Sequence, residues 1–123
     1  MKFYEQIVEK NSNYIKSYTA SSINIFDEIY KFNVIVPPRM EIIKCVKNSN
    51  NISTEFIISN LLYNVDFIII SLNDISLINK KSIILKLNKL NIGIDFMSIS
   101  AGCSCHNILL SENRNYLTYF LFK

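Results

Sequence analysis

Glycine and proline are scarce in this sequence, with two of each among 123 residues. Charged residues are also few, at 19%, whereas half of the residues are hydrophobic. Disordered chains have the opposite composition, so this balance argues against a disordered protein. The length suits one domain around one hydrophobic core, and we predict a single domain over residues 1–123.

Long hydrophobic runs are missing as well. The longest unbroken apolar run near the middle, residues 67–70, falls far short of the ~20 residues that a membrane-spanning helix needs. The first residues, Met1-Lys2-Phe3-Tyr4-Glu5, lack the apolar segment of a signal peptide. We therefore expect a cytoplasmic protein with no membrane contact, whose three cysteines stay reduced.

The sequence has no concentrated basic segment. Its net charge is +3, and its 13 lysines and arginines are scattered, with local pairs at Lys80-Lys81 and at Lys86 and Lys89. Domains that bind nucleic acids usually gather basic residues on one face. The distribution favours solvated helix faces over a phosphate-binding patch, and it argues against nucleic acid as the partner.

The hydrophobic pattern predicts two N-terminal helices within residues 1–36, followed by alternating strands and helices. Apolar residues at helical spacing indicate a helix over residues 2–18 and a second one that starts after Ser21 or Ser22. Asn33 and the pair Pro37-Pro38 are expected to stop the second helix. Strands are predicted at residues 40–46, 67–72, 92–99 and 116–122. Helices are predicted between them, from the cap Ser53 through Tyr63, from about Leu77 to Leu90, and after Gly102.

This alternation predicts the fold class α/β, with about four parallel strands joined by right-handed crossover helices. The segment 67–72 has a run of apolar residues without polar alternation. Such a strand is typical of a parallel sheet covered on both faces. At Ser100-Ala101-Gly102 the chain is expected to turn from strand into helix, with Gly102 in the turn and Ser104 as the helix cap.

Several segments from about Glu41 onward follow one another in a distinctive order. They are Ile43-Lys44-Cys45, Thr54-Glu55-Phe56, Ser71-Leu72-Asn73-Asp74, Leu87-Asn88-Lys89-Leu90-Asn91, Met97-Ser98-Ile99-Ser100-Ala101-Gly102 and Phe120-Leu121-Phe122. Their order and spacing resemble the EAL domain, the barrel-shaped phosphodiesterase of cyclic-di-GMP, with Gly102 as the shared signature residue. Since a closed β/α barrel needs about 200 residues or more, the resemblance implies a partial barrel over residues 40–123.

The metal ligands of that family are not retained in the resembling positions. The family binds two divalent cations through Glu, Asn and Asp side chains, as hard cations require. The residues at these ligand positions here are Cys45, Ser71, Met97, Ser98 and Phe122, while Phe120 stands where the family has a lysine, and only Asp74 keeps an acid. The resemblance therefore implies a protein that is not an enzyme and holds no cofactor. It looks most like the inactive family members that bind a flagellar transcription regulator and repress motility or virulence genes.

Outside this resemblance, the cysteines with His106 and the carboxylate Asp95 are residue types that can bind a metal or act in catalysis. Cys103, Cys105 and His106 form one cluster, whereas a structural zinc needs four ligands, commonly in two pairs. Free cysteine is often simply a core residue, so we favour packing over a metal site. A cysteine–histidine nucleophile is disfavoured because neighbours on a helix diverge, although Cys45 and His106 would meet if strand ends converge. Asp95, in an apolar strand, either faces water or needs a buried partner.

We therefore predict a non-enzymatic regulatory protein that acts by protein–protein interaction, on a transcription regulator of motility or virulence genes. The alternative is binding of cyclic-di-GMP or nucleic acid without catalysis. A homodimer, or a tight complex with the partner, is expected because a partial barrel leaves apolar surface and strand edges open. Residues 116–122 form either an open edge or a central strand. The expected contact residues are Phe3, Tyr4, Ile7, Phe26, Tyr30, Tyr116, Tyr119 and Phe122.

Overall fold

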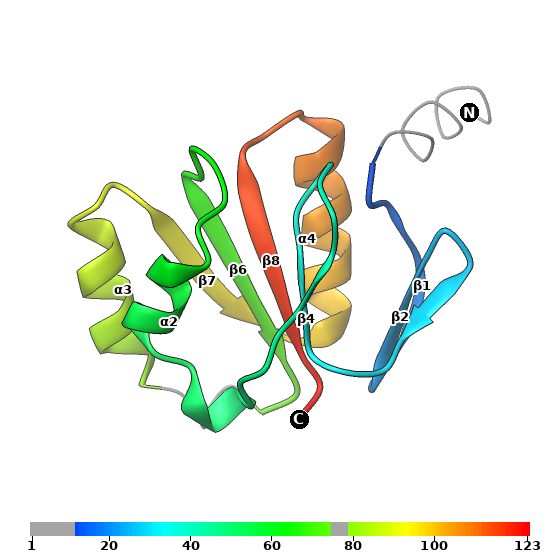
Figure 1. Cartoon of the computed structure of the whole chain (residues 1–123), viewed down its shortest axis with the longest axis horizontal. Coiled ribbons are helices and arrows are strands. Elements are labelled where there is room, and N and C mark those ends of the chain that lie inside the picture. The colour runs from blue at the N-terminus through cyan, green and yellow to red at the C-terminus, as the bar shows by residue number, and fades with distance from the viewer. Residues whose placement is uncertain (1–11, 75–78) are drawn as a thin grey trace.

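Two β-sheets and three α-helices make up residues 12–74 and 79–123, the part of the chain that this computed structural model describes (Figure 1). The first sheet is antiparallel and contains β1 (Ile15–Thr19), β2 (Ser22–Ile25) and β3 (Glu28–Tyr30). The second has the strand order β5-β4-β8-β6-β7. Its strands are β4 (Val34–Val36), β5 (Ile43–Lys44), β6 (Phe67–Leu72), β7 (Gly93–Met97) and β8 (Tyr116–Leu121). The helices are α2 (Thr54–Ser59), α3 (Lys80–Asn88) and α4 (Ile99–Ser111), with a short 3-10 helix η1 at Ser49–Asn51.

The predicted partial β/α barrel is wrong. β8 pairs in parallel with β6 but antiparallel with β4, and β4 also pairs antiparallel with β5. Together with the antiparallel sheet β1-β2-β3, this makes a mixed α/β fold with two open sheets. The barrel prediction failed because spacing along the chain cannot reveal an antiparallel strand inserted beside the parallel ones.

The predicted second N-terminal helix is also wrong, because its residues form a hairpin. Ile23 and Ile25 are buried and alternate with less buried neighbours, which is the period of a strand rather than of a helix. Phe26 and Asp27 connect β2 to β3 with φ angles of 54° and 63°. Two consecutive positive φ angles are typical of the tight turn that matches the twist of a hairpin. The predicted first helix falls partly on residues 1–11, outside the described residues, and its end is β1.

β8 has a neighbouring strand, β4, that was not predicted from the sequence. Val34–Val36 is fully buried and forms β4, which lies beside β8 (Figure 1). Asn33, expected to stop a helix, instead accepts hydrogen bonds from the backbone N–H groups of Phe122 (2.7 Å) and Lys123 (3.1 Å). β8 is therefore a central strand with neighbours on both sides, and the open-edge alternative is wrong.

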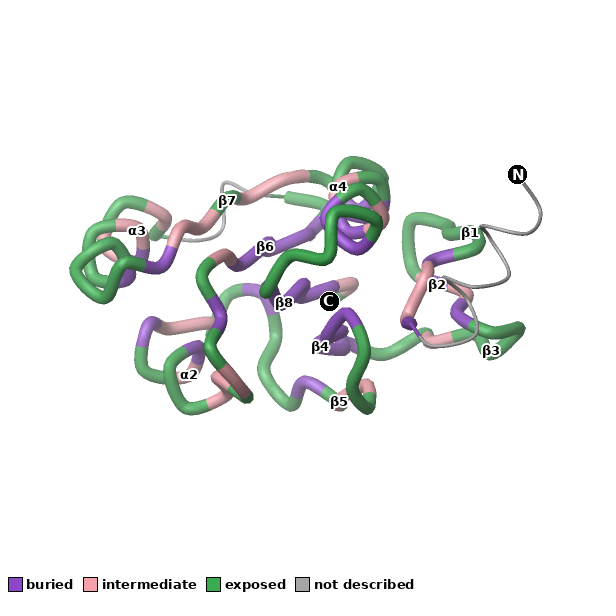
Figure 2. Tube along the Cα trace, turned by 90° about the horizontal axis from the view of Figure 1, so that it is seen from above, coloured by how far each residue is buried: buried purple, intermediate pink, exposed green. Residues whose placement is uncertain are grey.

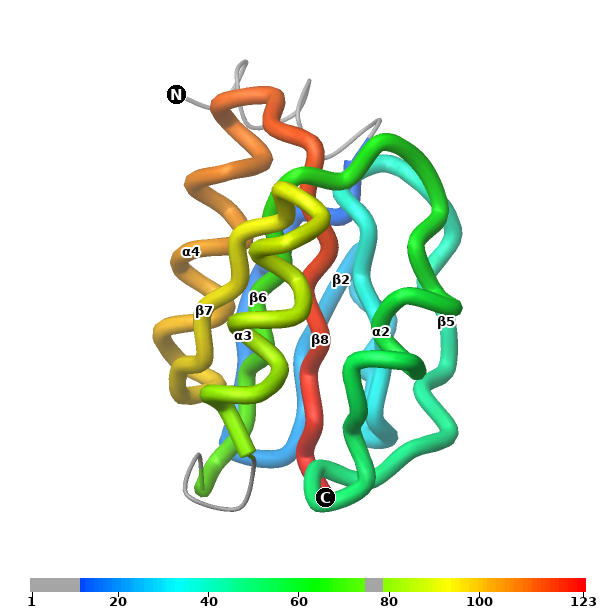
Figure 3. Tube along the Cα trace, turned by 90° about the vertical axis from the view of Figure 1, so that its left-hand side faces the viewer, coloured from blue at the N-terminus to red at the C-terminus, as the bar shows by residue number. Residues whose placement is uncertain are grey.

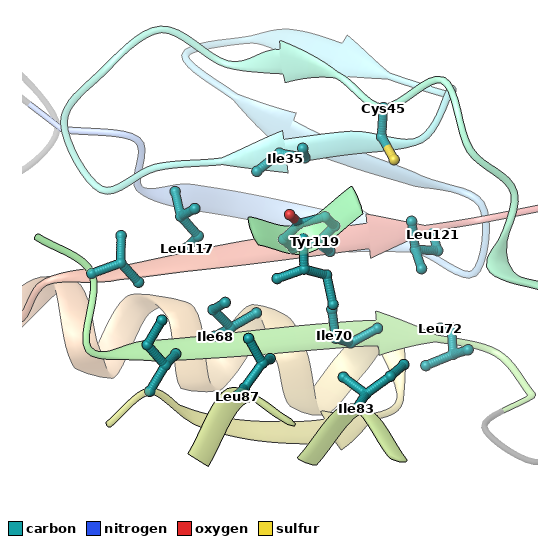
Figure 4. Close-up of a cluster of buried hydrophobic side chains, with 13 residues drawn as sticks. Ile35, Cys45, Ile68, Ile70, Leu72, Ile83, Leu87, Leu117, Tyr119 and Leu121 are labelled. Atoms are coloured by element: carbon teal, nitrogen blue, oxygen red, sulfur yellow. The ribbon is translucent and has the colours of Figure 1, made fainter. Parts of the chain in front are cut away.

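The five-stranded sheet is covered on both faces (Figure 2). One face packs against α2 and α3 through alternate residues of β6 and β8 (Figure 4); this cluster includes Ile57, Ile68, Ile70, Leu72, Ile83, Leu87, Leu117, Tyr119 and Leu121. The other face packs against α4 and the three-stranded sheet, through Ile69, Tyr116 and Phe120 among others. β8 consequently runs between α4 and α2 (Figure 3). The local prediction that residues 67–72 form a strand with parallel neighbours, buried on both faces, is confirmed.

Gly102 lies within α4 rather than in a turn, and its helix is capped by Ser98 rather than by Ser104. The Ser98 hydroxyl accepts a hydrogen bond from the N–H of Ala101 at 3.1 Å. A Cβ atom on Gly102 would lie 1.7 Å from Oγ and 2.6 Å from Cβ of Ser71. Glycine is therefore needed here because α4 approaches β6 too closely for any side chain.

We expect Gly102→Ala to lower the free energy of unfolding by about 1–3 kcal/mol, the usual range for overpacking a core. The loss arises although alanine favours a helix by about 1 kcal/mol over glycine. Urea denaturation measures it. Ser104→Ala, an exposed change on the same helix, should stay within about 0.5 kcal/mol of wild type. An unchanged unfolding midpoint for Gly102→Ala would contradict the close approach.

Candidate functional site

The structure brings together Ser71 and Met97, which stand where the EAL family has metal ligands, and Phe120, which stands at its lysine position, but they form no metal site. Ser71 on β6 lies in register with Met97 on β7 and with Phe120 on β8. The Ser71 hydroxyl is buried and has no hydrogen-bond partner among the described residues. Ser98 caps α4, and Cys45 lies apart from these residues, in the cluster that contacts α2 and α3. Within the described residues, no group of three or more His, Cys, Asp and Glu side chains is placed to hold a metal ion.

His106 is fully buried, and both of its ring nitrogens are engaged. Nε2 lies 2.8 Å from the backbone oxygen of Asn13, which can only accept, so Nε2 carries the proton. Nδ1 therefore accepts from the hydroxyl of Thr118 at 2.9 Å. Burial lowers the pKa of His106 to about 4, so the ring is neutral at pH 7. The imidazole is a packing and hydrogen-bonding residue between α4, β8 and the segment that precedes β1.

The three thiols are not placed as nucleophiles. Cys45 and Cys103 are buried, and Cys105 is half-buried. Burial raises the pKa of all three thiols, that of Cys103 to about 12. Since the thiolate is the reactive form, these environments disfavour nucleophilic chemistry. The described side-chain hydrogen bonds of His106 go to Thr118 and Asn13 rather than to a cysteine.

The expected contact residues are divided between the interior and the surface. Tyr116 and Tyr119 are fully buried in β8, so they present no surface to a partner in this fold. Phe122 is half-buried and stacks on Phe120, with ring centroids 6.4 Å apart. Phe26 is 54% exposed at the hairpin turn, and Tyr30 is half-buried. Phe3, Tyr4 and Ile7 lie outside the described residues.

Sequence reasoning missed a groove between β1 and α4. It encloses about 410 Å³ and is lined by residues 14–18 on one side and by Cys103, Ser104 and Asn107 on the other. Asn107 fixes its floor, because its side chain donates to the backbone oxygen of Ile15 (2.9 Å) and accepts from the N–H of Ile15 (3.0 Å). At one end the Tyr18 hydroxyl lies 2.8 Å from the hydroxyl of Ser100.

The surface beside this groove carries almost no charge. No charged residue occurs between Asp95 and Glu112 in the sequence, so all of α4 is uncharged. Its outward face includes Ala101, Ser104 and Ile108, the last 56% exposed. This uncharged run is the signal in the sequence from which the surface could have been found.

Across the groove, one charged residue of the lining, Lys16, forms an ion pair. The ammonium group of Lys16 lies 3.1 Å from a carboxylate oxygen of Asp27. Tyr18, in the groove lining, is 47% exposed, and Phe26, which shares a neighbouring pocket with Tyr14 and Lys16, is 54% exposed. We call the set Tyr18, Phe26, Ala101, Ser104 and Ile108, with the groove between them, the α4 surface.

Among solved structures, the chain is similar to the Xanthomonas campestris protein XCC1710, with 15% identity, a TM-score of 0.74, and 88% of this chain and 83% of that chain covered. It is also similar to a Bordetella parapertussis protein, with 14% identity, a TM-score of 0.73, and coverage of 89% and 95%. A protein of Bordetella pertussis, described as a Mth938-like domain, has 11% identity, a TM-score of 0.69, and coverage of 89% and 85%. No protein-family model and no curated protein matches the chain.

These comparisons, at 11% to 15% identity, show the fold alone. The fold is that of Mth938-like domain proteins, so the resemblance to an EAL domain is wrong. The spacing that carried it also fits a sheet in which β6, β7 and β8 are parallel and β4 is antiparallel. The described part of the chain contains no helix that is both long and apolar enough to cross a membrane.

We expect the free energy of unfolding to decrease as the solution is made more acidic, because of His106. The unfolded chain binds a proton at this residue near pH 6.5, whereas the folded protein does so only near its pKa of about 4. Between these values the unfolded state binds more protons, so about 3 kcal/mol of stability is lost as pH falls from ~6.5 to ~4. Urea denaturation of wild type and His106→Gln across this range measures the difference, which should shrink as pH falls.

An NMR titration provides the direct check. His106 is the only histidine in the chain, so its ring signal needs no assignment. A measured pKa near the ordinary value for histidine, about 6.5, would contradict the buried, doubly engaged ring.

Proposed function

We propose that this protein is a non-enzymatic regulator that binds another protein through the α4 surface, in the cytoplasm. The observation that carries the proposal is α4 itself, a helix of 13 residues without a charged side chain and with Ser104 and Ile108 exposed. A helix at the surface of a soluble domain normally has charged residues on its outer face. The cytoplasmic location is supported by the three free thiols.

The composition of the α4 surface is typical of a protein interface. The central part of interfaces is depleted of charged residues and enriched in tyrosine and phenylalanine. Tyr18 and Phe26 are about half exposed, and the adjacent Lys16 and Asp27 pair with each other. A partner therefore meets an apolar and hydrogen-bonding surface rather than a charged one.

We infer that the occupant is a partner helix with an uncharged face. The small residues Ala101 and Ser104 leave room for a second helix to approach α4 closely, since the distance between packed helices depends on the side chains at the contact. Residues 14–18 and Ile108 would flank the contact on two sides.

The non-enzymatic part of the proposal is supported by the engaged nitrogens of His106 and the raised thiol pKa values. A general base needs a nitrogen that is free to reach substrate. The expected link to a transcription regulator rested on the EAL resemblance alone, so the proposal names no particular partner.

The test is photo-crosslinking in the cell of origin, with a photoreactive amino acid in place of Ser104. We expect one protein to be captured from Ser104, and none from the matched control at Lys81, an exposed residue of α3 on the opposite face of the sheet. The captured protein, once purified, should bind the unmodified chain directly in a titration. Ser104→Arg should weaken this binding by about 100-fold, because it places an unpaired charge in a buried contact.

Two outcomes would overturn the proposal. One is equal capture from Ser104 and Lys81, which would indicate non-specific contact. The other is unchanged affinity of Ser104→Arg when circular dichroism shows that the variant is folded.

A further inference from the structure

A second surface feature, separate from the α4 surface, is a pocket of about 230 Å³ near the starts of β6 and β8. Two arginines, Arg39 and Arg114, line it, together with Tyr63 and the amide side chains of Asn113 and Asn115. Pro38 and Met40 complete the wall. The lining contains no acidic residue, so the pocket combines two cations with neutral hydrogen-bonding groups.

The loop that carries Arg39 is held rigidly on both sides of the arginine. The Asn13 side chain donates to the backbone oxygens of Pro37 (2.8 Å) and Met40 (2.7 Å). The backbone N–H of Asn13 donates to the oxygen of Pro38 at 2.8 Å. Two consecutive prolines restrict the loop further. Arg39 therefore starts from a fixed backbone position.

Arg114 is positioned by the end of α4. Asn113 adopts a φ of 58°, and its N–H donates to Leu110, while the N–H of Arg114 donates to Leu109. This pair of bonds is the Schellman ending of a helix, and asparagine is one of the residues that favour the left-handed position. The negative end of the helix is thus already satisfied by backbone donors, and by the Arg39 guanidinium, which donates to Leu110 at 3.3 Å.

Most of the donors of both guanidinium groups remain unused. An arginine has five N–H donors, and within the described residues Arg39 uses Nη2 on one carbonyl and makes no salt bridge. Arg114 pairs with Glu112 at 3.6 Å, but both side chains are about half exposed, where such a pair contributes little. Tyr63 donates its hydroxyl to the backbone of Tyr116, and burial raises the pKa of Tyr63 to about 12, so it adds no negative charge.

We propose that this pocket binds an oxyanion, the phosphate or carboxylate group of a small molecule. The guanidinium fork matches the geometry of both groups, and the fixed loop and helix end reduce the entropy lost on binding. The volume is below the ~300 Å³ of typical drug-sized sites, so the ligand is small. This site is independent of the α4 surface, and the failure of either proposal leaves the other intact.

NMR titration of the full chain tests the site with two probes, inorganic phosphate and succinate, at constant ionic strength set by chloride. We expect saturable shifts of the side-chain Nε–H signals of Arg39 and Arg114 and of the amides of residues 113–115, with at least one probe. The stronger probe identifies the source of the anion as phosphoryl or carboxylate.

Arg39→Gln and Arg114→Gln should each weaken the binding about tenfold or more, since each removes charge-assisted hydrogen bonds. The fold should persist in Arg39→Gln, because Leu110 still accepts the N–H of Asn113. Lys89→Gln is the matched control: it makes the same change in net charge at the C-cap of α3, outside the pocket lining, and should bind as wild type does.

Three results would overturn the site. They are no saturation by either probe up to millimolar concentrations, shifts that map elsewhere on the molecule, or equal weakening by Lys89→Gln. The last would mean that net charge alone attracts the anion.

Discussion

The fold depends on polar contacts that join α4 to the start of β1 and to the residues just before it. His106 contacts Asn13 and Thr118, and the next residue, Asn107, pairs with both backbone groups of Ile15. The bond between His106 and Thr118 is buried, and those of Asn13 and Asn107 are partly buried. Leaving a buried polar group unpaired costs about 1–3 kcal/mol. One turn of helix therefore fixes where the three-stranded sheet lies against the five-stranded one.

The same contacts extend to both proposed binding regions. The backbone oxygen of Asn13 accepts a hydrogen bond from Nε2–H of His106, and its side chain and backbone N–H donate to the backbone of residues 37–40. Asn107 sets the separation of β1 from α4 and so the width of the groove. The α4 surface and the pocket lined by Arg39 and Arg114 thus share one set of polar contacts, although their chemistry differs.

The sequence predicted the elements whose signals are local. β6 has the predicted bounds, and Ser53 caps α2 through the N–H of Phe56, as expected. The pairing between distant strands could not be predicted, because β4 has only three residues, too few for a periodic pattern. Its pairing with β8 decided between the two alternatives for residues 116–122 and made β8 a central strand. The hairpin over residues 22–30 was missed because Phe26-Asp27 is not among the strongest turn signals.

The candidate site was predicted less well, since its residues acquire their meaning only in three dimensions. Arg39 and Arg114 are 75 positions apart in the chain, and nothing in either local sequence links them. Cys103 and His106 were candidates because of their residue types. Burial makes Cys103 an unreactive thiol and His106 a neutral ring. The uncharged run that forms α4 was visible in the sequence, but only its exposed face distinguishes a surface from a core helix.

The strand edges explain why a helix face, rather than a β-edge, is the better place for a protein partner. In β7 the N–H of Gly93 points to β6, bonding the oxygen of Asp66 at 2.9 Å. Since backbone groups alternate in direction along a strand, those of Ile94 and Phe96 face the open edge. The Asp95 side chain accepts the N–H of Phe96 at 2.9 Å, which removes one of these donors.

The other edges are blunted in different ways. On β1, the side chain of Asn107 already pairs with the backbone N–H and oxygen of Ile15. β5 has only two residues, and β3 has three and begins with the charged residue Glu28. Short strands and charges at the edge are the usual means by which proteins prevent pairing between chains. A partner strand would therefore find few free donors at any edge, whereas a partner helix would find α4 uncharged and partly exposed.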